Sequence, residues 1–267
     1  MPDNRPGSPF RDLHDRAGAF IIPNPWDAGS AKILAALGFE ALATTSAGFA
    51  HSLARKDGGV TSAEMLQHCR DIVAATPLPV SADLEKGFGD TPESAADTIR
   101  QAAGTGLAGA SIEDFSGDAS KPLYDFSLAV ERIAAAVEAA RGLGRDFVLT
   151  ARSENFLHGR PDLDDTIKRL QAFEAAGADV LYAPGLRGLD QIRAVCSAVS
   201  KPVNVLAGGS LGFAELEAAG AKRLSVGSGL ARVAYGSFIQ AAKEMRENGT
   251  FTFARNAASF AEIEGYF

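Results

Sequence analysis

Acidic residues stand at the ends of two neighbouring predicted β-strands, where their side chains could gather. Asp83 and Glu85 close the run PVSADLE, and Glu113 closes the next such run, AGASIE. If the extended backbone continues past Asp83, residues two apart leave the strand on the same side. Carboxylates that meet in a partly dry cleft repel one another, and a hard divalent cation relieves that repulsion. The pattern predicts a metal site at Asp83, Glu85 and Glu113 for Mg2+, with Mn2+ possible, although each acid taken singly could cap a helix or face solvent.

Groups that could bind an anion follow other predicted strands. Arg152 comes directly after the run VLTA, and a buried guanidinium at a strand end needs an anion, either a substrate carboxylate or phosphate or one of the nearby acids. The segment Ser46-Ala47-Gly48 offers a hydroxyl and consecutive backbone N–H groups, which suit an oxyanion. Gly227-Ser228-Gly229 is similar to a phosphate-binding turn, but a tight turn that needs glycine is the simpler interpretation.

The sequence gives less support to catalysis by a lysine, as in a Schiff-base enzyme, or by a histidine. Lys222 begins a predicted strand and so points away from an active site at the strand ends, while Lys86 is typical of a loop charge. Of the four histidines, only His51 and His158 follow strands at positions from which they could assist.

The elements that must position these residues are short β-rich runs alternating with longer amphipathic runs. Eight strands are predicted, at 19–23, 40–45, 79–83, 108–113, 146–151, 179–183, 202–206 and 222–226. Helices are predicted between them, including 62–75, 92–104, 127–142, 163–177 and 189–200. Several of these begin with Ser, Thr or Asp and end at Gly, as helix caps do. This alternation predicts parallel strands joined by helical crossovers.

Eight such units predict one (β/α)8 barrel of the TIM type, an α/β fold, as a single domain over residues 1–267. Residues 1–18 are expected to form an N-terminal extension and 249–267 a helical tail, with a short helix within 256–267. A doubly wound sheet is the alternative, but no G-x-G-x-x-G follows the first strand. In a barrel the active site lies at the C-terminal strand ends, where the acids and Arg152 are predicted.

Composition narrows the classes of partner. The chain has 33 Asp and Glu against 26 Lys and Arg, a net charge of -7, and no basic run. Neither nucleic acid nor an anionic membrane is therefore expected. No apolar run approaches the roughly 20 residues of a membrane span, and two cysteines, Cys69 and Cys196, do not suggest a disulfide framework. A cytoplasmic protein is expected.

Six motifs at the predicted strand ends occur in an order that is typical of one superfamily. They are NPWDAGSA, ATTSAGFA, RKDGGVT, SADLEKGFGD, GASIED and TARSE. In them the chain resembles the isocitrate lyase and phosphoenolpyruvate mutase superfamily from about Ile21 to Asn204. The resemblance implies a Mg-dependent barrel that makes or breaks C–C or C–P bonds beside a 2-oxo carboxylate, through a metal-bound enolate. It also implies a homodimer or homotetramer in which subunits exchange the last barrel helix.

The resemblance also implies a role for each site residue. Asp83 would bind Mg2+ directly, while Asp57, Glu85 and Glu113 would act mainly through water. Candidate catalytic residues are Arg152, Asp57 and Glu113, and candidate substrate-binding residues are Ser46, Ala47, Gly48, Asp83, Arg152 and Asn204.

Two departures from the superfamily pattern concern proton transfer. In the lyases a K-K/R-C-G-H loop follows strand four, and the cysteine of this loop transfers the proton. The corresponding segment here, EDFSGDASKPLYD, has no cysteine. The mutases and phosphonopyruvate hydrolases carry a gating loop there, of which Lys121-Pro122 is the remnant. The loop 115–125 is expected to act as lid and proton source, with no residue standing out as general acid.

The sequence thus predicts a Mg-dependent carbon–carbon lyase that cleaves a bond next to a small 2-oxo carboxylate, as in decarboxylation of an oxaloacetate-like acid. One alternative is a phosphonomutase or phosphonopyruvate hydrolase-like enzyme that acts on a C–P bond. Another is a Schiff-base aldolase on the same fold. The third is a non-catalytic 2-oxo acid binding protein.

Overall fold

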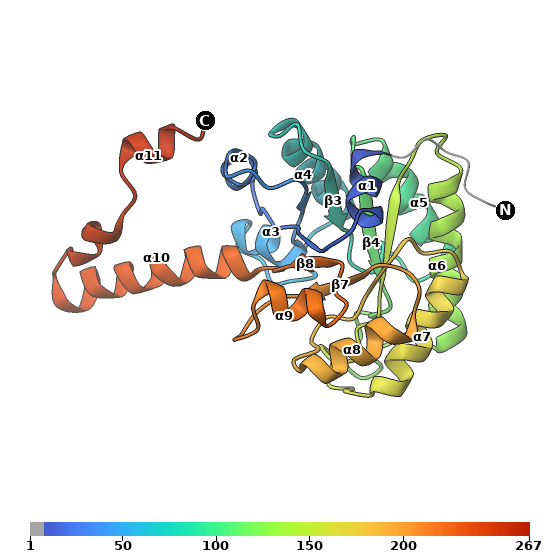
Figure 1. Cartoon of the computed structure of the whole chain (residues 1–267). Helices are drawn as coiled ribbons and strands as arrows, with labels where there is room; N and C mark the ends of the chain where they lie inside the picture. The colour runs from blue at the N-terminus through green and yellow to red at the C-terminus, as the bar shows by residue number, and fades with distance from the viewer. Residues whose placement is uncertain (1–7) are drawn as a thin grey trace.

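A computed structural model describes residues 8–267, in which eight parallel strands curl into a barrel surrounded by helices (Figure 1). The strands are β1 (Phe20–Ile21), β2 (Leu42–Ala43), β3 (Val80–Asp83), β4 (Gly109–Glu113), β5 (Val148–Arg152), β6 (Val180–Tyr182), β7 (Val203–Leu206) and β8 (Arg223–Ser225). Each lies within or at the edge of a predicted run, so the (β/α)8 class is confirmed. Residues 1–7 of the expected N-terminal extension lie outside the described residues.

The helices of the described chain cover the outside of the barrel and continue beyond it. They are α1 (Pro9–Asp15), α2 (Ala28–Ala36), α3 (Ser46–Ser52), α4 (Ser62–Ala74), α5 (Pro92–Ala103), α6 (Phe126–Arg141), α7 (Leu163–Ala175), α8 (Leu189–Ala198), α9 (Phe213–Ala218), α10 (Gly229–Asn248), the 3-10 helix η1 (Thr252–Asn256) and α11 (Phe260–Glu264). Predicted capping is present at α4, where Thr61 accepts a hydrogen bond from Glu64 N and Glu64 accepts one from Thr61 N.

The strand order β1-β8-β7-β6-β5-β4-β3-β2 leaves β1 and β2 at the ends of the ladder. A backbone hydrogen bond from Ala43 N to Pro23 O (3.0 Å) joins these ends. A second bond, from Asn24 Nδ2 to Thr44 O (3.1 Å), supports the closure. Side chains of residues paired across parallel strands point to the same face of the sheet. The register aligns one polar residue from each of five consecutive strands: Glu113, Arg152, Tyr182, Asn204 and Arg223.

Helix α1 packs under the N-terminal end of the barrel. Phe10 is fully buried among barrel residues that include Phe20. His14 donates from Nδ1 to Phe10 O (2.8 Å), so its Nε2, 3.3 Å from Arg223 NH1, must be the acceptor. The imidazole is therefore neutral in the fold. Burial, followed by the charge of Arg223, lowers the pKa of His14 to about 3.

This buried neutral histidine predicts a loss of stability in mild acid. A group that stays unprotonated in the folded state but protonates near its ordinary pKa of about 6.5 when unfolded costs stability as pH falls below that value. Between pH 7 and pH 5 we expect wild type to lose about 2 kcal/mol of unfolding free energy relative to His14→Asn. Urea unfolding at both pH values measures this, with His51→Asn, at an exposed position, as control. Equal pH dependence in wild type and His14→Asn would contradict the assignment.

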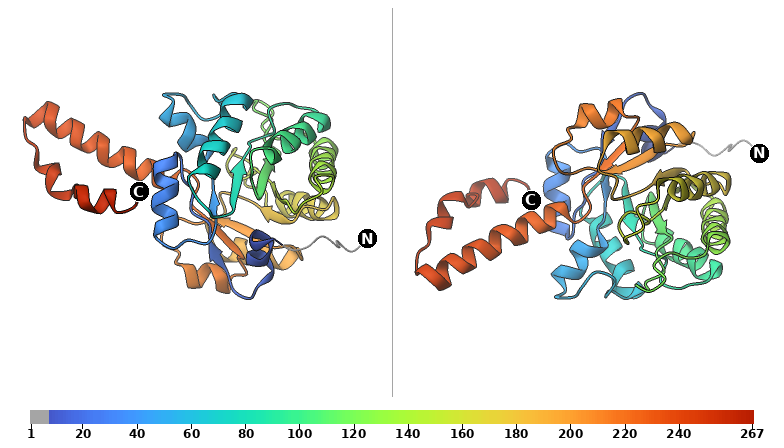
Figure 2. Two further views of the ribbon diagram at one scale, coloured as in Figure 1. Left: turned by 90° about the horizontal axis from the view of Figure 1, so that it is seen from above. Right: turned by 90° about the horizontal axis from the view of Figure 1, so that it is seen from below.

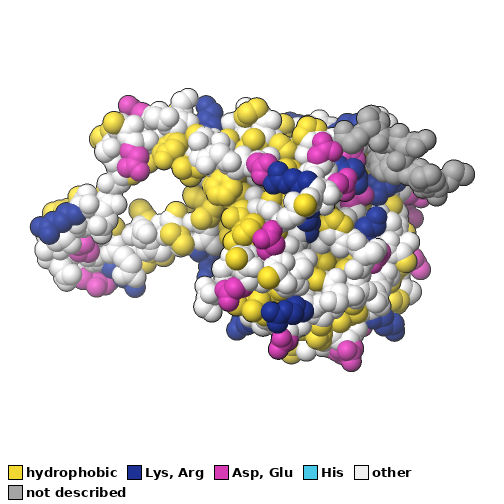
Figure 3. Space-filling model, in the orientation of Figure 1, with side chains coloured by type: hydrophobic (Ala, Val, Ile, Leu, Met, Phe, Trp, Pro, Cys, Tyr) yellow, Lys and Arg dark blue, Asp and Glu magenta, His cyan; other side chains and the backbone are white. Residues whose placement is uncertain are grey.

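Helix α10 leaves the barrel, and η1 and α11 fold back beside it as an arm, with α11 inside the segment 256–267 for which a short helix is predicted (Figures 1 and 2). The arm exposes large apolar side chains: Val233, Phe238, Ile239, Met245, Phe251, Phe260, Ile263 and Phe267. Hydrophobic surface also borders the hollow between the arm and the barrel (Figure 3). Across residues 8–267, no helix combines the length and apolarity that a membrane crossing requires.

Candidate active site

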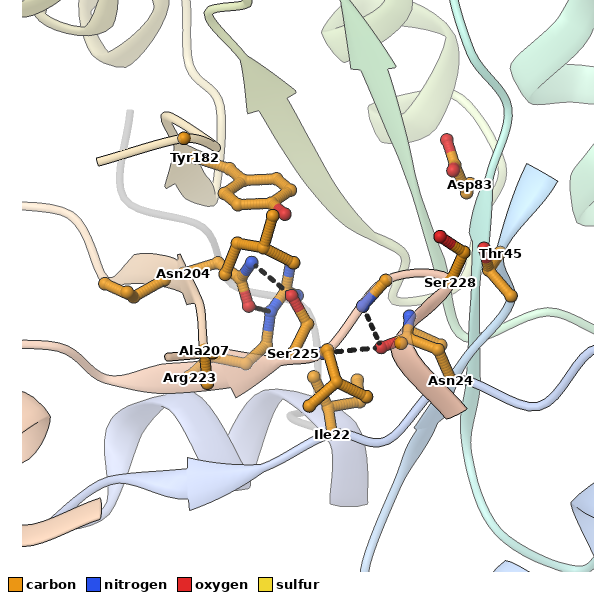
Figure 4. Close-up of a pocket in the computed structure, with 18 of the residues that line it drawn as sticks. Ile22, Asn24, Thr45, Asp83, Tyr182, Asn204, Ala207, Arg223, Ser225 and Ser228 are labelled. Atoms are coloured by element: carbon orange, nitrogen blue, oxygen red, sulfur yellow. Dashed lines mark hydrogen bonds between the residues drawn. The ribbon is translucent and has the colours of Figure 1, made fainter. Parts of the chain in front are cut away.

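A cavity of about 850 Å3 opens at the C-terminal ends of the strands. Its size suits a small molecule, and its position is the one that barrels use for catalysis. Six predicted site residues line it: Ser46, Ala47, Asp57, Asp83, Arg152 and Asn204. Asp83 and Asn204 lie on opposite sides of the view in Figure 4. Three other predicted residues, Gly48, Glu85 and Glu113, are outside the cavity lining.

Asp83 connects two of the predicted binding elements. Its Oδ1 accepts from Arg152 NH1 (2.8 Å), and its Oδ2 accepts from both N (3.2 Å) and Oγ (2.9 Å) of Ser46. Strand β3 ends at this residue, while Ser46 begins α3 directly after β2. The fold thus brings the carboxylate, the guanidinium and the hydroxyl predicted from separate strands into contact.

Arg152 is paired with acids of the site in this structure. Its guanidinium lies 2.8 Å from Asp83 Oδ1, 3.1 Å from Glu113 Oε2 and 2.9 Å from Glu154 Oε1. Burial alone would lower the pKa of Arg152, but Glu154, Glu113 and Asp83 raise it well above the usual value. The guanidinium is therefore permanently charged. The sequence left two kinds of partner open for it, a substrate anion or the nearby acids, and in this structure the nearby acids bind it.

The backbone turns sharply at Glu85. The prediction that Asp83 and Glu85 leave the strand on the same side assumed an extended backbone at this residue, and that assumption is wrong. The Glu85 φ of 52° lies in the left-handed region, which is rare for residues other than glycine. The side chain nevertheless comes close to the other acids. Burial, then the charges of Asp83 and Asp57, raises the pKa of Glu85 to about 7. Its Oε1 is buried without a hydrogen-bond partner.

Two further acids share this electrostatic environment. Asp57, in the loop after α3, accepts from Ser46 Oγ (3.2 Å), and burial followed by the charge of Asp83 raises its pKa. Glu113 is buried, and burial raises its pKa although Arg152 acts in the opposite direction. Asp57 and Glu113 are thus part of one acidic cluster with Asp83 and Glu85.

The chemistry of this cluster fits a hard divalent cation. All of its donors are carboxylate oxygens, burial and then mutual repulsion raise the pKa values of Asp57, Glu85 and Glu113, and the buried Glu85 Oε1 without a hydrogen-bond partner calls for a positive partner. Within residues 8–267, no three Asp, Glu, His or Cys side chains converge closely enough to ligate one ion directly. Any ion held by this set would keep several waters, as bound Mg2+ usually does.

Gly48 does not serve the cavity as predicted. Its N–H donates to Thr45 Oγ1 (3.3 Å), and a Cβ at this position would stand 2.7 Å from Thr45 Cγ2 and 3.0 Å from Trp26 Cβ. The glycine is required by packing at the start of α3, so Ser46 and Ala47 are the members of the segment that reach the cavity.

The lysines and histidines considered as catalytic groups contact other residues of the fold. Lys222 donates to the carbonyls of Arg16 and Gly18, at the opposite end of β8 from the cavity. Lys86 donates to Asp90 and to Ser116 O. Among the histidines, the ring of His51 contacts Tyr235 edge-on, while His158 stacks on Phe115.

The loop 115–125 and the turn 227–229 are also tied into the structure. A β-bridge between Phe115 and Leu123 closes the loop into a small hairpin. The turn lines the cavity, but Gly227 N donates to Asn24 Oδ1 (2.9 Å) and so is already bonded.

Tyr182, Arg223 and Ser225 are among the cavity residues that the sequence analysis does not identify. Tyr182 lies inside the apolar run 179–183, where its residue type does not mark it as a site residue. A usable signal did exist for Arg223, because a charge inside a strand of a barrel must point to a polar interior or be paired.

Comparison with known proteins places the chain in a family. A sequence model described as phosphoenolpyruvate phosphomutase matches residues 10–246. The crystal structure of a putative lyase/mutase from Burkholderia cenocepacia J2315 is 59% identical, with a TM-score of 0.94, covering 97% of this chain and 94% of that one. An oxaloacetate decarboxylase of Paraburkholderia xenovorans is 31% identical, covering 73% of this chain and 66% of the relative. A 2-methylisocitrate lyase of Escherichia coli is 30% identical, covering 76% and 70% respectively. The chain therefore belongs to the phosphoenolpyruvate phosphomutase family, within the superfamily of isocitrate lyase-type lyases and mutases.

Proposed function

We propose that this protein is a Mg-dependent carbon–carbon lyase that cleaves the bond next to a small 2-oxo carboxylate, with decarboxylation of an oxaloacetate-like acid as the leading case. The observation that carries the proposal is the contact of the Arg152 fork with Asp83 and, through it, Ser46, inside the cavity. The similarity to an oxaloacetate decarboxylase supports the choice of substrate class.

Each residue of the cavity has a task in this reaction. Arg152 would bind the substrate carboxylate through two parallel N–H groups, in place of one of its present acidic partners. Ser46 would donate its hydroxyl hydrogen to the 2-oxo acid in place of Asp83 or Asp57, and Asn204 would contact the remainder of the substrate. These contacts hold the scissile bond in a fixed orientation while the electrons of that bond move towards the keto oxygen and form an enolate.

Asp83 and the acids around it would hold the divalent ion. When bound, the ion supplies a Lewis acid that stabilises negative charge on the keto oxygen. Asp57, Glu85 and Glu113 would contribute through water, consistent with their spacing and their raised pKa values.

A substrate screen tests the proposal. Oxaloacetate, its alkylated relatives, 2-methylisocitrate and phosphonopyruvate are each incubated with and without Mg2+, and release of pyruvate or carbon dioxide is followed. We expect Mg-dependent turnover of an oxaloacetate-type acid. Phosphate release from phosphonopyruvate, or its rearrangement, seen by phosphorus NMR, would instead indicate a C–P enzyme. Mg-dependent binding with no product would indicate a binding protein.

We further propose that the protein is a homodimer or homotetramer in which α10 is exchanged between subunits. The exposed fractions of Val233 (68%) and Phe238 (69%) on this helix are high for side chains that a partner does not cover. We expect Phe238→Arg to shift the protein towards the 27.8 kDa monomer in analytical ultracentrifugation, with Gln240→Arg on the same helix as control. A monomeric wild type, or an unchanged mass in Phe238→Arg, would refute the exchange.

A further inference from the structure

A directional chain of hydrogen bonds runs across the inside of the barrel, through residues that line the cavity. It starts at Arg223, whose Nε donates to Asn204 Oδ1 (2.9 Å). Asn204 Nδ2 then donates to Ser225 Oγ (2.9 Å), as Figure 4 shows. Asn204 and Arg223 are buried, with exposed fractions of 1% and 5%.

The direction of this chain is fixed by Arg223. A guanidinium has donors only, so the amide oxygen of Asn204 must face it and the amide nitrogen must face Ser225. Burial lowers the pKa of Arg223 to about 10, which still leaves it charged at neutral pH. Other acceptors around it are the neutral His14 Nε2 (3.3 Å) and Thr150 Oγ1 (3.0 Å). Among residues 8–267 no carboxylate pairs with Arg223. No acidic partner therefore competes with Asn204 for the Arg223 donor.

The next residue along this chain is Ser225, and its hydroxyl acts on Tyr182. Because the Ser225 oxygen accepts from Asn204, its own hydroxyl hydrogen is left to be donated, and the Ser225 hydroxyl acts to lower the pKa of Tyr182 against the effect of burial. A hydroxyl that lowers the pKa of a phenol directs its hydrogen towards the phenol oxygen, which here is that of Tyr182. The hydroxyl hydrogen of Tyr182 remains for another acceptor, and the residue lines the cavity.

Tyr182 stands beside the group proposed to hold the substrate. The guanidinium carbon of Arg152 lies 5.2 Å from the centre of the Tyr182 ring, and the two residues are opposite each other in the β5–β6 register. Burial raises the pKa of Tyr182 to about 12, so the hydroxyl stays protonated at neutral pH. A protonated hydroxyl next to the bound carboxylate is suited to donate a proton and poorly suited to accept one.

We propose that Tyr182 delivers the proton that converts the enolate to product, with Ser225, Asn204 and Arg223 as positioning residues that point its hydrogen into the cavity. This inference rests on the proposed function. The O–H bond of Tyr182 breaks, and the enolate electron pair forms a C–H bond as the carbonyl is restored. The Tyr182 oxygen keeps the O–H electrons, is stabilised by the Ser225 hydroxyl and the Arg152 charge, and is reprotonated by solvent.

The test measures where the proton comes from. Decarboxylation of 3-methyloxaloacetate in D2O gives 2-oxobutanoate with a single deuterium at C3, which is a stereogenic centre. A proton delivered by a fixed side chain gives one configuration, whereas a proton taken from bulk water gives both. NMR after enzymatic reduction distinguishes these products. Oxalate binding, measured by calorimetry, reports whether the cavity is intact.

We expect wild type to give one configuration. Tyr182→Phe should give equal amounts of both and a kcat lowered by about a hundredfold, the usual scale of general acid catalysis, with oxalate binding retained. Ser225→Ala should lower kcat but keep one configuration. Tyr124→Phe removes a hydroxyl outside the cavity lining and should match wild type.

Retention of rate and of a single configuration by Tyr182→Phe would overturn the inference while leaving the proposed function standing. Loss of oxalate binding in that variant would also overturn it, because the hydroxyl would then serve binding. Absence of turnover by wild type with Mg2+ on any acid of the screen would overturn the proposed function and this inference together.

Discussion

Replacement of Asp83 with alanine is expected to lower kcat/KM at least about a thousandfold, a loss of about 4 kcal/mol of transition-state stabilisation. The carboxylate fixes one arm of the Arg152 fork and accepts two hydrogen bonds from Ser46. It is also the proposed direct ligand of the ion. One substitution therefore removes the metal contact and loosens both groups that would hold the substrate.

The same substitution should leave the fold nearly unchanged. Arg152 keeps Glu113 and Glu154 as partners, and the charge of Asp83 contributes to the raised pKa values of Asp57 and Glu85. Removal of that charge relieves repulsion, which offsets the lost ion pair.

Steady-state kinetics across Mg2+ concentrations and urea unfolding of the Asp83→Ala protein test both statements. We expect an unfolding free energy within about 1 kcal/mol of wild type. Asp97→Ala, which removes an exposed acid paired with Arg100, is the matched control and should change neither quantity. Mg-dependent activity retained by Asp83→Ala would remove the residue from the metal site.

Much of the fold could be predicted because its signal is local. Strands that are buried on both faces give continuous apolar runs, and crossover helices carry their own caps, so the periodicity of the chain defined all eight strands. The same logic placed Asp83 and Arg152 at one end of the barrel, since every parallel strand ends at that rim.

What escaped prediction depends on three-dimensional register. The left-handed backbone at Glu85 cannot be inferred from a residue type that seldom adopts it. Gly48 looked like part of an anion cradle, but its neighbours Thr45 and Trp26 show a steric requirement instead. The sequence around Tyr182 does not show that the β5–β6 pairing sets this residue opposite Arg152.

Substitutions of Arg152 separate the need for its charge from the need for its shape. Arg152→Met leaves Asp83, Glu113 and Glu154 without their shared cation, and the side chains of Glu113 and Glu154 are only 9% and 2% exposed. Removal of one partner from a buried ion pair typically costs about 3–5 kcal/mol, so we expect a loss of unfolding free energy of that size. Urea unfolding of the variant measures it. Stability equal to wild type would show that these acids do not depend on Arg152.

Arg152→Lys keeps the charge but replaces a planar fork with a point charge that reaches fewer acceptors. We expect most of the stability to be retained, because one ammonium can still neutralise part of the cluster. The KM for oxaloacetate should rise about tenfold to a hundredfold, since a bidentate contact with the substrate carboxylate is lost. An unchanged KM in Arg152→Lys would mean that Arg152 serves only the acids it already touches. A raised KM with near-normal stability would mean that substrate displaces one of those acids and takes its place on the same guanidinium.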